Sequence, residues 1–135
     1  PAGSPLRLSS NVSVTALVVD DVEANIAVLA RALKHLGAKA SEASDGQQAL
    51  DKVREGPFDI VFMDIRLPGI NGVETLLQLR DRSPDLLILL MTGCERGSEE
   101  AMFAKTAGAT DLLFKPFKIK QMLDQVDNIL QTENG

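Results

Sequence analysis

Cysteine and aromatic residues are scarce in this sequence. Its 135 residues include one cysteine, Cys94, and five phenylalanines, with no tryptophan or tyrosine. A single cysteine excludes an internal disulfide and fits a reducing compartment, so we expect a cytoplasmic location. Because aromatic rings are so few, the core has to be built from aliphatic side chains.

Excess positive charge and long hydrophobic runs are also missing. The chain has 14 Lys and Arg residues against 19 Asp and Glu residues, which gives a net charge of −5. Nucleic acid binding needs a basic surface, so this charge argues against a DNA- or RNA-binding function for the domain. No uncharged apolar run reaches the roughly 18–20 residues of a membrane span, and no signal peptide is recognisable, so we expect no membrane contact.

The sequence does contain 44% hydrophobic residues, which is enough for the core of one domain of ordinary size. Residues 1–13 are rich in Pro, Gly and Ser and predict a linker. We expect the domain at residues 14–131 and a short tail at residues 132–135. The start at Pro1 rather than Met, together with the linker, favours a segment of a longer protein.

Short apolar runs alternate with helical patterns along the domain. The predicted strands are residues 15–20, 38–43, 58–64, 85–93 and 110–114. The predicted helices are residues 22–36, 45–54, 72–80 and 98–108, followed by a last helix that begins near Lys118. This alternation predicts an α/β fold, a doubly wound five-stranded parallel sheet with helices on both faces.

Buried helix faces and helix ends follow from local signals. The first helix has an apolar stripe that Gly37 ends, formed by Val22, Ile26, Leu29, Leu33 and Leu36. Asp45 and Ser98 predict N-caps of the second and fourth helices. On the fourth helix, Met102 and Phe103 cannot both face the core, so we expect partial packing of both, with a partner surface as the alternative.

Polar residues stand where the predicted strands end. Asp20 and Asp21 follow the first strand, Asp64 ends the third, Thr92 lies at the end of the fourth, and Lys115 follows the fifth. The carboxyl ends of parallel strands form one edge of the sheet, where ligands bind in doubly wound folds. We therefore expect three carboxylates, one hydroxyl and one ammonium to converge at this edge.

Such a group of side chains suits a phosphoryl group and a hard cation. Clustered carboxylates repel one another and attract a cation, and their oxygen atoms suit Mg²⁺ (or Mn²⁺). Thr92 and Lys115 are hydrogen-bond donors, so an anion that bridges metal, hydroxyl and ammonium would satisfy them all. Taken one at a time, these residues could instead be a helix N-cap, a plain strand end and a solvated lysine.

Asp64 is the candidate nucleophile among the three carboxylates. It ends the central strand, and the chain then turns at Pro68–Gly69. A carboxylate can accept a phosphoryl group and form an acyl phosphate. Asp20 and Asp21 are adjacent and better placed to hold the metal.

Four segments together resemble a known family. They are LVVDD at 17–21, MDIRLPGINGVE at 63–74, MTG at 91–93 and FKPF at 114–117. In this order and at strand ends, they resemble the response-regulator receiver domain of bacterial two-component signalling, over roughly residues 14 to 131. The resemblance implies a flavodoxin-like (βα)5 fold with strand order 2-1-3-4-5.

The resemblance also implies roles for the acidic residues. Asp64 resembles the phosphoacceptor. Asp21 resembles the direct Mg²⁺ ligand and Asp20 a ligand that acts through water. The backbone carbonyl of Arg66 would be the remaining protein ligand.

The residues of the last two strands resemble a conformational switch with one departure. Thr92 resembles the hydroxyl that turns toward the phosphoryl group, Lys115 resembles the invariant ammonium, and the Lys115–Pro116 bond is expected to be cis. The family often has Tyr or Phe three residues before the lysine, and here that residue is Leu112. Whether Thr92 is coupled to an aromatic ring in the usual way is therefore an open question, and so is the surface that passes on the signal.

Arg66 and Cys94 occupy variable positions beside the expected phosphoryl group. Side chains at such positions contact the phosphoryl group or block attacking water, so we expect them to influence the dephosphorylation rate. Arg66 could also pair with Glu23 or Glu95.

The resemblance implies a histidine kinase or a histidine phosphotransfer protein as the partner. It also allows a homodimer through the fourth helix, fifth strand and last helix. The linker and the segment VVDDVEAN at 18–25 favour a receiver fused after a histidine kinase over a free-standing one. As a receiver the domain would phosphorylate itself and slowly dephosphorylate, without being a turnover enzyme by itself.

Three other functions compete with this interpretation. An aspartyl-nucleophile phosphohydrolase often has a second Asp two residues after the nucleophile, where this chain has Arg66. A flavin or nucleotide carrier needs a Gly- or Ser/Thr-rich phosphate loop after the first strand, where this chain is acidic. A pseudo-receiver that only binds partners usually lacks one of the five polar residues, and none is missing here.

Overall fold

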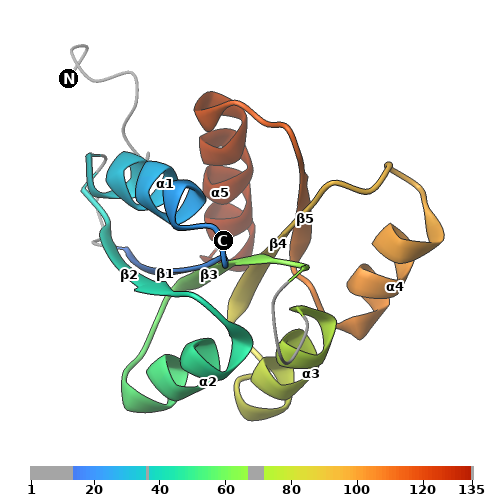
Figure 1. Cartoon of the computed structure of the whole chain (residues 1–135), viewed down its shortest axis with the longest axis horizontal. Helices are drawn as coiled ribbons and strands as arrows, with labels where there is room; N and C mark the ends of the chain where they lie inside the picture. Colours follow the sequence, from blue (N-terminus) through green and yellow to red (C-terminus); the bar gives the residue numbers. More distant parts are fainter. Residues whose placement is uncertain (1–13, 36, 67–71, 135) are drawn as a thin grey trace.

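The structure is a computed structural model that describes residues 14–35, 37–66 and 72–134. The predicted linker at residues 1–13, the predicted turn at Pro68–Gly69 and the predicted core residue Leu36 lie outside these ranges. The described residues form one parallel sheet and the helices that cover it (Figure 1).

The sheet has five parallel strands in the order 2-1-3-4-5, as the family resemblance implies. The strands are β1 (Thr15–Val19), β2 (Lys39–Ala43), β3 (Ile60–Asp64), β4 (Leu87–Thr92) and β5 (Asp111–Phe114). The helices are α1 (Glu23–His35), α2 (Gly46–Glu55), α3 (Gly72–Arg82), α4 (Glu99–Ala107) and α5 (Ile119–Asn134). The predicted α/β class and doubly wound topology are confirmed.

Helices cover both faces of the sheet because its central strands β3 and β4 are apolar up to their last residues, Asp64 and Thr92. Every residue of β3 and β4 is buried. Alternate side chains pack in a first core with α1 and α5 and in a second core with α2, α3 and α4, on opposite faces of the sheet (Figure 1). In the part of the chain that the structure describes, none of the helices combines the length and hydrophobicity that crossing a bilayer requires.

Local signals set the helix ends much as predicted. Asp45 is the N-cap of α2 and accepts a hydrogen bond from Gln48 N at 2.8 Å. Ser98 is the N-cap of α4 and accepts from Ala101 N at 3.2 Å. Gly108 ends α4 with a φ of 121°, which glycine adopts without strain.

Two details of the prediction are wrong. Val22 is 48% exposed, because α1 begins one residue later and the Val22 amide turns to Asp20. Met102 and Phe103 are 64% and 58% exposed, because small alanines at 101 and 104 occupy the buried face of α4. The last helix, α5, begins at Ile119, one residue after the predicted start near Lys118.

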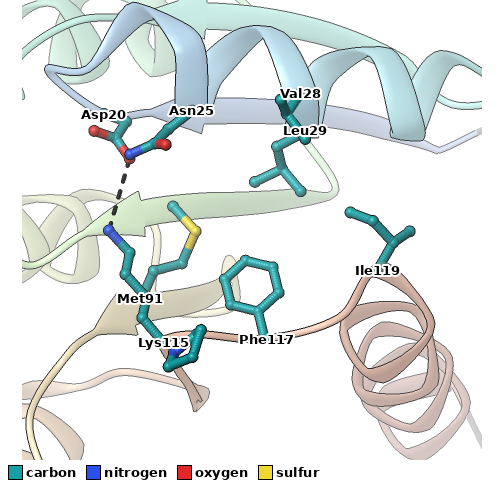
Figure 2. A pocket seen from close by; sticks show the side chains of 9 residues that line it. Asp20, Asn25, Val28, Leu29, Met91, Lys115, Phe117 and Ile119 are labelled. Carbon is teal, nitrogen blue, oxygen red and sulfur yellow. Dashed lines mark hydrogen bonds and ion pairs between the residues drawn. The ribbon is translucent and has the colours of Figure 1, made fainter.

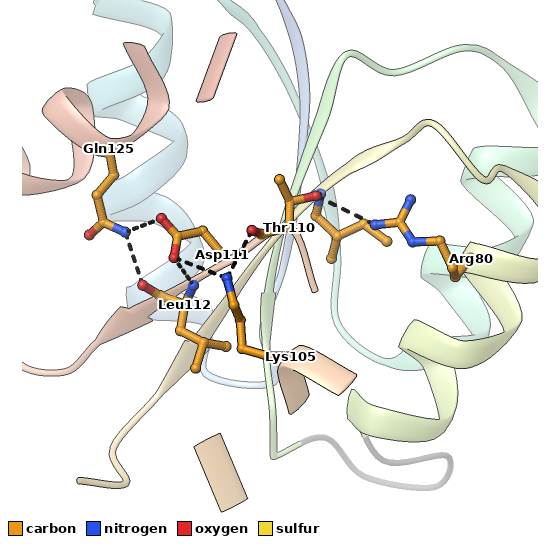
Figure 3. A network of polar contacts seen from close by, with 7 residues as sticks. Arg80, Lys105, Thr110, Asp111, Leu112 and Gln125 are labelled. Carbon is orange, nitrogen blue, oxygen red and sulfur yellow. Dashed lines mark hydrogen bonds and ion pairs between the residues drawn. The ribbon is translucent and has the colours of Figure 1, made fainter. Parts of the chain in front are cut away.

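Polar contacts attach the edge strand β5 to the helices and loops around it (Figure 3). Arg80 of α3 donates to Gly108 O at 3.0 and 2.7 Å and to Leu86 O at 2.6 Å, so it joins the segments before β4 and β5. On β5 itself, the Asp111 carboxylate accepts from Gln125 of α5 at 3.2 Å and lies 3.8 Å from Lys105 of α4. These contacts fix the strand that leads to Lys115.

Candidate functional site

Asp64 is the last residue of β3 and lies at the carboxyl edge of the sheet. Its side chain is largely shielded, since the residue is only 8% exposed. Oδ1 accepts a hydrogen bond from Arg66 N at 2.9 Å, and Oδ2 accepts from Lys115 Nζ at 2.5 Å. One carboxylate oxygen is therefore hydrogen-bonded to the backbone amide of Arg66, and the other to the Lys115 ammonium.

The chain segment after Asp64 passes very close to the start of α3. A Cβ atom on Gly72 would lie 2.6 Å from Asp64 O and 2.5 Å from Ile65 O, distances that real side chains do not adopt. Gly72 N also donates to Ile65 O at 3.0 Å. Glycine at this position thus allows the close backbone approach that fixes the end of β3.

Asp20 follows β1 and is the most deeply buried acid of the site, with 1% exposure. Its carboxylate accepts from Val22 N at 2.9 Å and Asn25 Nδ2 at 3.3 Å, and Lys115 Nζ lies 3.9 Å away. Burial raises the pKa of Asp20 above its ordinary value, and the charge of Asp64 adds to this effect, while the hydrogen bonds and Lys115 oppose it.

Thr92 and Lys115 meet across neighbouring strands. Thr92 is 1% exposed, its Oγ1 accepts from Cys94 N at 3.1 Å, and its carbonyl accepts from Lys115 N at 2.7 Å. The predicted cis bond between Lys115 and Pro116 is confirmed. The Lys115 ammonium contacts the carboxylates of both Asp64 and Asp20, so these three residues converge as the sequence predicts.

A cavity of about 590 Å³ adjoins this cluster (Figure 2). Asp20, Asn25 and Lys115 form its polar end. Its walls are apolar and come from α1, from β4 and from the segment that enters α5, namely Val28, Leu29, Met91, Pro116, Phe117 and Ile119. The carboxyl edge thus has both a charged group and an apolar hollow beside it.

Asp21 does not join this cluster. It is exposed and lines a different hollow together with Glu23 and Glu42. Within residues 14–35, 37–66 and 72–134, no group of three or more acidic, histidine or cysteine side chains is arranged to hold a metal ion by itself. The structure therefore brings two of the three carboxylates together, and the role of Asp21 as a metal ligand stays a prediction.

Arg66 is exposed at the rim of the site. None of the ion pairs among the described residues joins it to Glu23 or Glu95, the partners considered from the sequence. Leu112 is buried in the second core, so the position where the family often has an aromatic ring holds an aliphatic core residue.

Asn25 and Gly72 are site residues to which sequence reasoning gave no role. The signal for Asn25 was its place five residues after Asp20, at the first turn of the helix that follows. The signal for Gly72 was a second glycine in the segment PGINGVE, which follows the candidate nucleophile Asp64. The apolar cavity had no comparable signal, because its walls come from three distant segments.

Comparison with known proteins gives a consistent result. Residues 16–127 match the model of the response regulator receiver domain. The chain is 36% identical over 113 residues to the transcriptional regulatory protein ZraR of Klebsiella oxytoca, which covers 84% of this chain and 25% of that protein. It is 32% identical over 126 residues to the probable transcriptional regulatory protein TcrX of Mycobacterium tuberculosis, which covers 93% of this chain and 53% of that protein.

A solved structure agrees with the sequence relatives. The chemotaxis response regulator CheY4 of Vibrio cholerae superposes with a TM-score of 0.82 and 28% identity, covering 87% of this chain and 99% of that chain. This chain spans only about a quarter of ZraR and about half of TcrX. The likeness to those two proteins is thus confined to one part of each.

Proposed function

Because the chain belongs to the response regulator receiver domain family, we propose that it is the phosphoacceptor of a two-component phosphorelay, with Asp64 as the phosphorylated residue. The donor would be a phosphohistidine of a histidine kinase or a histidine phosphotransfer protein. The observation that carries the proposal is the contact of Lys115 Nζ with Asp64 Oδ2 beside the buried carboxylate of Asp20.

The proposed reaction is a transfer of one phosphoryl group. An Asp64 oxygen attacks the phosphorus, the P–N bond of the phosphohistidine breaks, and the imidazole nitrogen keeps the bonding electron pair. The ammonium of Lys115 is within reach to neutralise charge on the phosphoryl oxygens. Thr92 Oγ1 accepts a hydrogen bond from Cys94 N. The Thr92 side chain would turn toward the new phosphoryl group and so start the conformational change.

The donor set of the site fits Mg²⁺. Asp20 and Asp64 are two carboxylates that share one ammonium, that of Lys115, and a bound cation would offset the burial that raises the pKa of Asp20. Together with the Arg66 carbonyl and Asp21, they would hold the cation through oxygen atoms alone. Bound Mg²⁺ would supply positive charge against which the phosphoryl group and the two carboxylates can approach each other.

The cavity of Figure 2 supports a docking place for the donor protein. It opens beside Lys115, and Val28 at its wall is 61% exposed. An apolar side chain that precedes or follows the phosphohistidine could occupy it and so bring the donor to Asp64.

The remaining parts of the proposal concern the surroundings of the domain. We place it in the cytoplasm, without nucleic acid or membrane contact of its own, and with its output in another domain or protein. The exposed Met102 and Phe103 on α4 support a homodimer through the α4–β5–α5 face. The preference for a receiver fused to a histidine kinase stays a prediction, and the relatives named above, which are regulators, do not support it.

Phosphorylation by a small donor tests the proposal directly. The parent chain, incubated with phosphoramidate and Mg²⁺, should gain the mass of one phosphoryl group, and Asp64→Asn should gain none. Asp81→Asn, at an exposed acid of α3, is the matched control and should behave like the parent. Equal phosphorylation of Asp64→Asn would contradict the role of Asp64 as the phosphoacceptor. No phosphorylation of the parent would contradict the proposal and favour a module that only binds partners.

A further inference from the structure

Phe114 is the aromatic residue that stands next to Thr92. The two residues are register partners on β4 and β5. Side chains alternate along a strand, and Leu90 and Leu112 belong to the second core, so Thr92 and Phe114 face the same side of the sheet. Neighbouring strands lie about 4.7–4.9 Å apart, so a displacement of Thr92 would change the space beside the Phe114 ring.

Arg96 covers the ring of Phe114 from the loop that follows β4. Its guanidinium carbon lies 4.4 Å from the ring centroid, a cation–π contact. The ring packs only partly against the second core, and Arg96 is itself exposed, so the guanidinium holds the loop against β5 from the solvent side. The contact ties the loop between β4 and α4 to the residue that precedes Lys115.

The same loop is attached to the Thr92 hydroxyl. Thr92 Oγ1 accepts from Cys94 N at 3.1 Å, and Ser98 N donates to Glu95 O at 3.2 Å in the turn that carries Arg96. A hydroxyl that turns toward Asp64 has to leave Cys94 N without this acceptor. The loop then loses its hydrogen bond to Thr92, while the stack of Arg96 on Phe114 still holds it to β5.

We propose that Arg96 and Phe114 form a latch that keeps the β4–α4 loop in its resting position and opens when Asp64 is phosphorylated. This inference rests on the proposed function, because the phosphoryl group is what draws Thr92 away. It assigns to Phe114 and Arg96 the coupling that the aliphatic Leu112 cannot provide. Arg96 is a positioning residue here and makes no contact with the reacting atoms.

Affinity for beryllofluoride with Mg²⁺, a stand-in for the phosphoryl group, tests the latch. Arg96→Gln removes the cation and should bind beryllofluoride about two- to fivefold more tightly, the factor that an exposed cation–π contact represents. Phe114→Leu should give a similar gain. Arg82→Gln, at an exposed arginine of α3, is the control and should bind like the parent.

The double variant separates a latch from general loosening of the fold. If the two side chains act through one contact, Arg96→Gln with Phe114→Leu should bind no more tightly than either single variant. In the parent, the NMR signal of the Arg96 Nε proton should lose its ring-current shift when beryllofluoride binds, and it should keep that shift in Asp64→Asn.

The outcomes distinguish the two proposals. If the parent does not bind beryllofluoride, the phosphoacceptor function fails and the latch fails with it. If the parent binds in a manner that depends on Asp64, but the gains of the single variants add or the Arg96 signal stays unchanged, the latch alone is overturned.

Discussion

At the scale of single residues, Asp20 is a buried carboxylate whose negative charge lowers the stability of the fold. The carboxylate is 1% exposed, and burial raises its pKa above the ordinary value of 3.8. A carboxyl whose pKa is higher in the folded than in the unfolded chain binds its proton more tightly when folded. Its contribution to stability is therefore present below about pH 3.8 and is lost as the pH rises through the folded value.

We predict that Asp20→Asn raises the melting temperature at pH 7 by a few degrees, because the buried charge is removed while the shape is kept. The gain should shrink as the pH falls toward 4. Calorimetry of the parent and the variant between pH 4 and 7 measures it. A variant that is less stable than the parent throughout this range would show that the Asp20 charge stabilises the fold.

Gly72 is a second residue whose identity the site requires. We predict that Gly72→Ala costs about 1–3 kcal/mol, because its Cβ would overlap the backbone of Asp64 and Ile65. Gly56→Ala is the control, since a Cβ there has no atom within 4 Å and the φ of −162° suits any residue. Urea unfolding of both variants measures the difference, and equal stability would contradict the prediction.

At the scale of elements, the position of β5 depends on Arg80. The Arg80 guanidinium donates hydrogen bonds to the carbonyls of Gly108, Leu86, Pro84 and Ser83 and so links α3 to the segments that lead into β4 and β5. A lysine at this position has a single charged nitrogen and cannot reach these acceptors together.

We predict that Arg80→Lys costs about 1.5–3 kcal/mol, the range for hydrogen bonds to a charged group. Faster amide hydrogen exchange at Ile88 and Thr110 should accompany the loss, because these residues bond each other across the β4–β5 pair. Arg82→Lys, in the exposed last turn of the same helix, should change neither measurement.

Exposed apolar side chains lie on both sides of the sheet, Val28 on α1 and Met102 on α4. Substituting them one at a time distinguishes donor docking from dimer formation. We predict that Val28→Asp, at the wall of the cavity, slows phosphotransfer from a phosphohistidine protein at least severalfold and leaves self-association unchanged. Met102→Asp should weaken self-association and leave phosphotransfer unchanged. Sedimentation in the presence of beryllofluoride measures the fraction of dimer. Phosphorylation by phosphoramidate is the control, because neither change should alter it. If Val28→Asp had no effect on transfer, the cavity would not be the donor's docking place.

At the scale of the whole molecule, ligand binding at the carboxyl edge should stabilise the entire fold. The edge gathers residues from β1, β3 and β5, so a cation held there ties together strands that are distant in the sequence. A ligand that binds only the folded state stabilises it by about 2.7 kcal/mol at a concentration 100-fold above its dissociation constant.

We predict that saturating MgCl₂ raises the melting temperature of the parent by several degrees, and that beryllofluoride raises it further. Asp20→Asn should lose most of the Mg²⁺ effect, whereas Asp81→Asn should retain it. An equal Mg²⁺ response in all three proteins would point to non-specific screening and would remove Asp20 from the proposed metal site.

Much of this molecule could be predicted from the sequence, because its signals are local or repeat along the chain. The apolar runs and amphipathic stripes indicated the strands and helices, and the rule that parallel strands share a carboxyl edge brought Asp20, Asp64, Thr92 and Lys115 together. Exact ends differed by one or two residues, because hydrophobic patterning does not mark the single residue at which backbone pairing stops. Helix faces were less certain where an alanine competed with a larger residue, as at Met102 and Phe103.

The sequence by itself determined the fold class, the order of the chemical groups along the chain and the identity of the candidate phosphoacceptor. Only the tertiary structure decided which groups touch. It placed Asp21 at a different hollow from Asp20, buried Leu112 in the core, stacked Arg96 on Phe114 and formed an apolar cavity between α1 and the start of α5. The physical reason is that these contacts join segments far apart in the chain or depend on side-chain direction, and neither periodicity nor spacing records such distances.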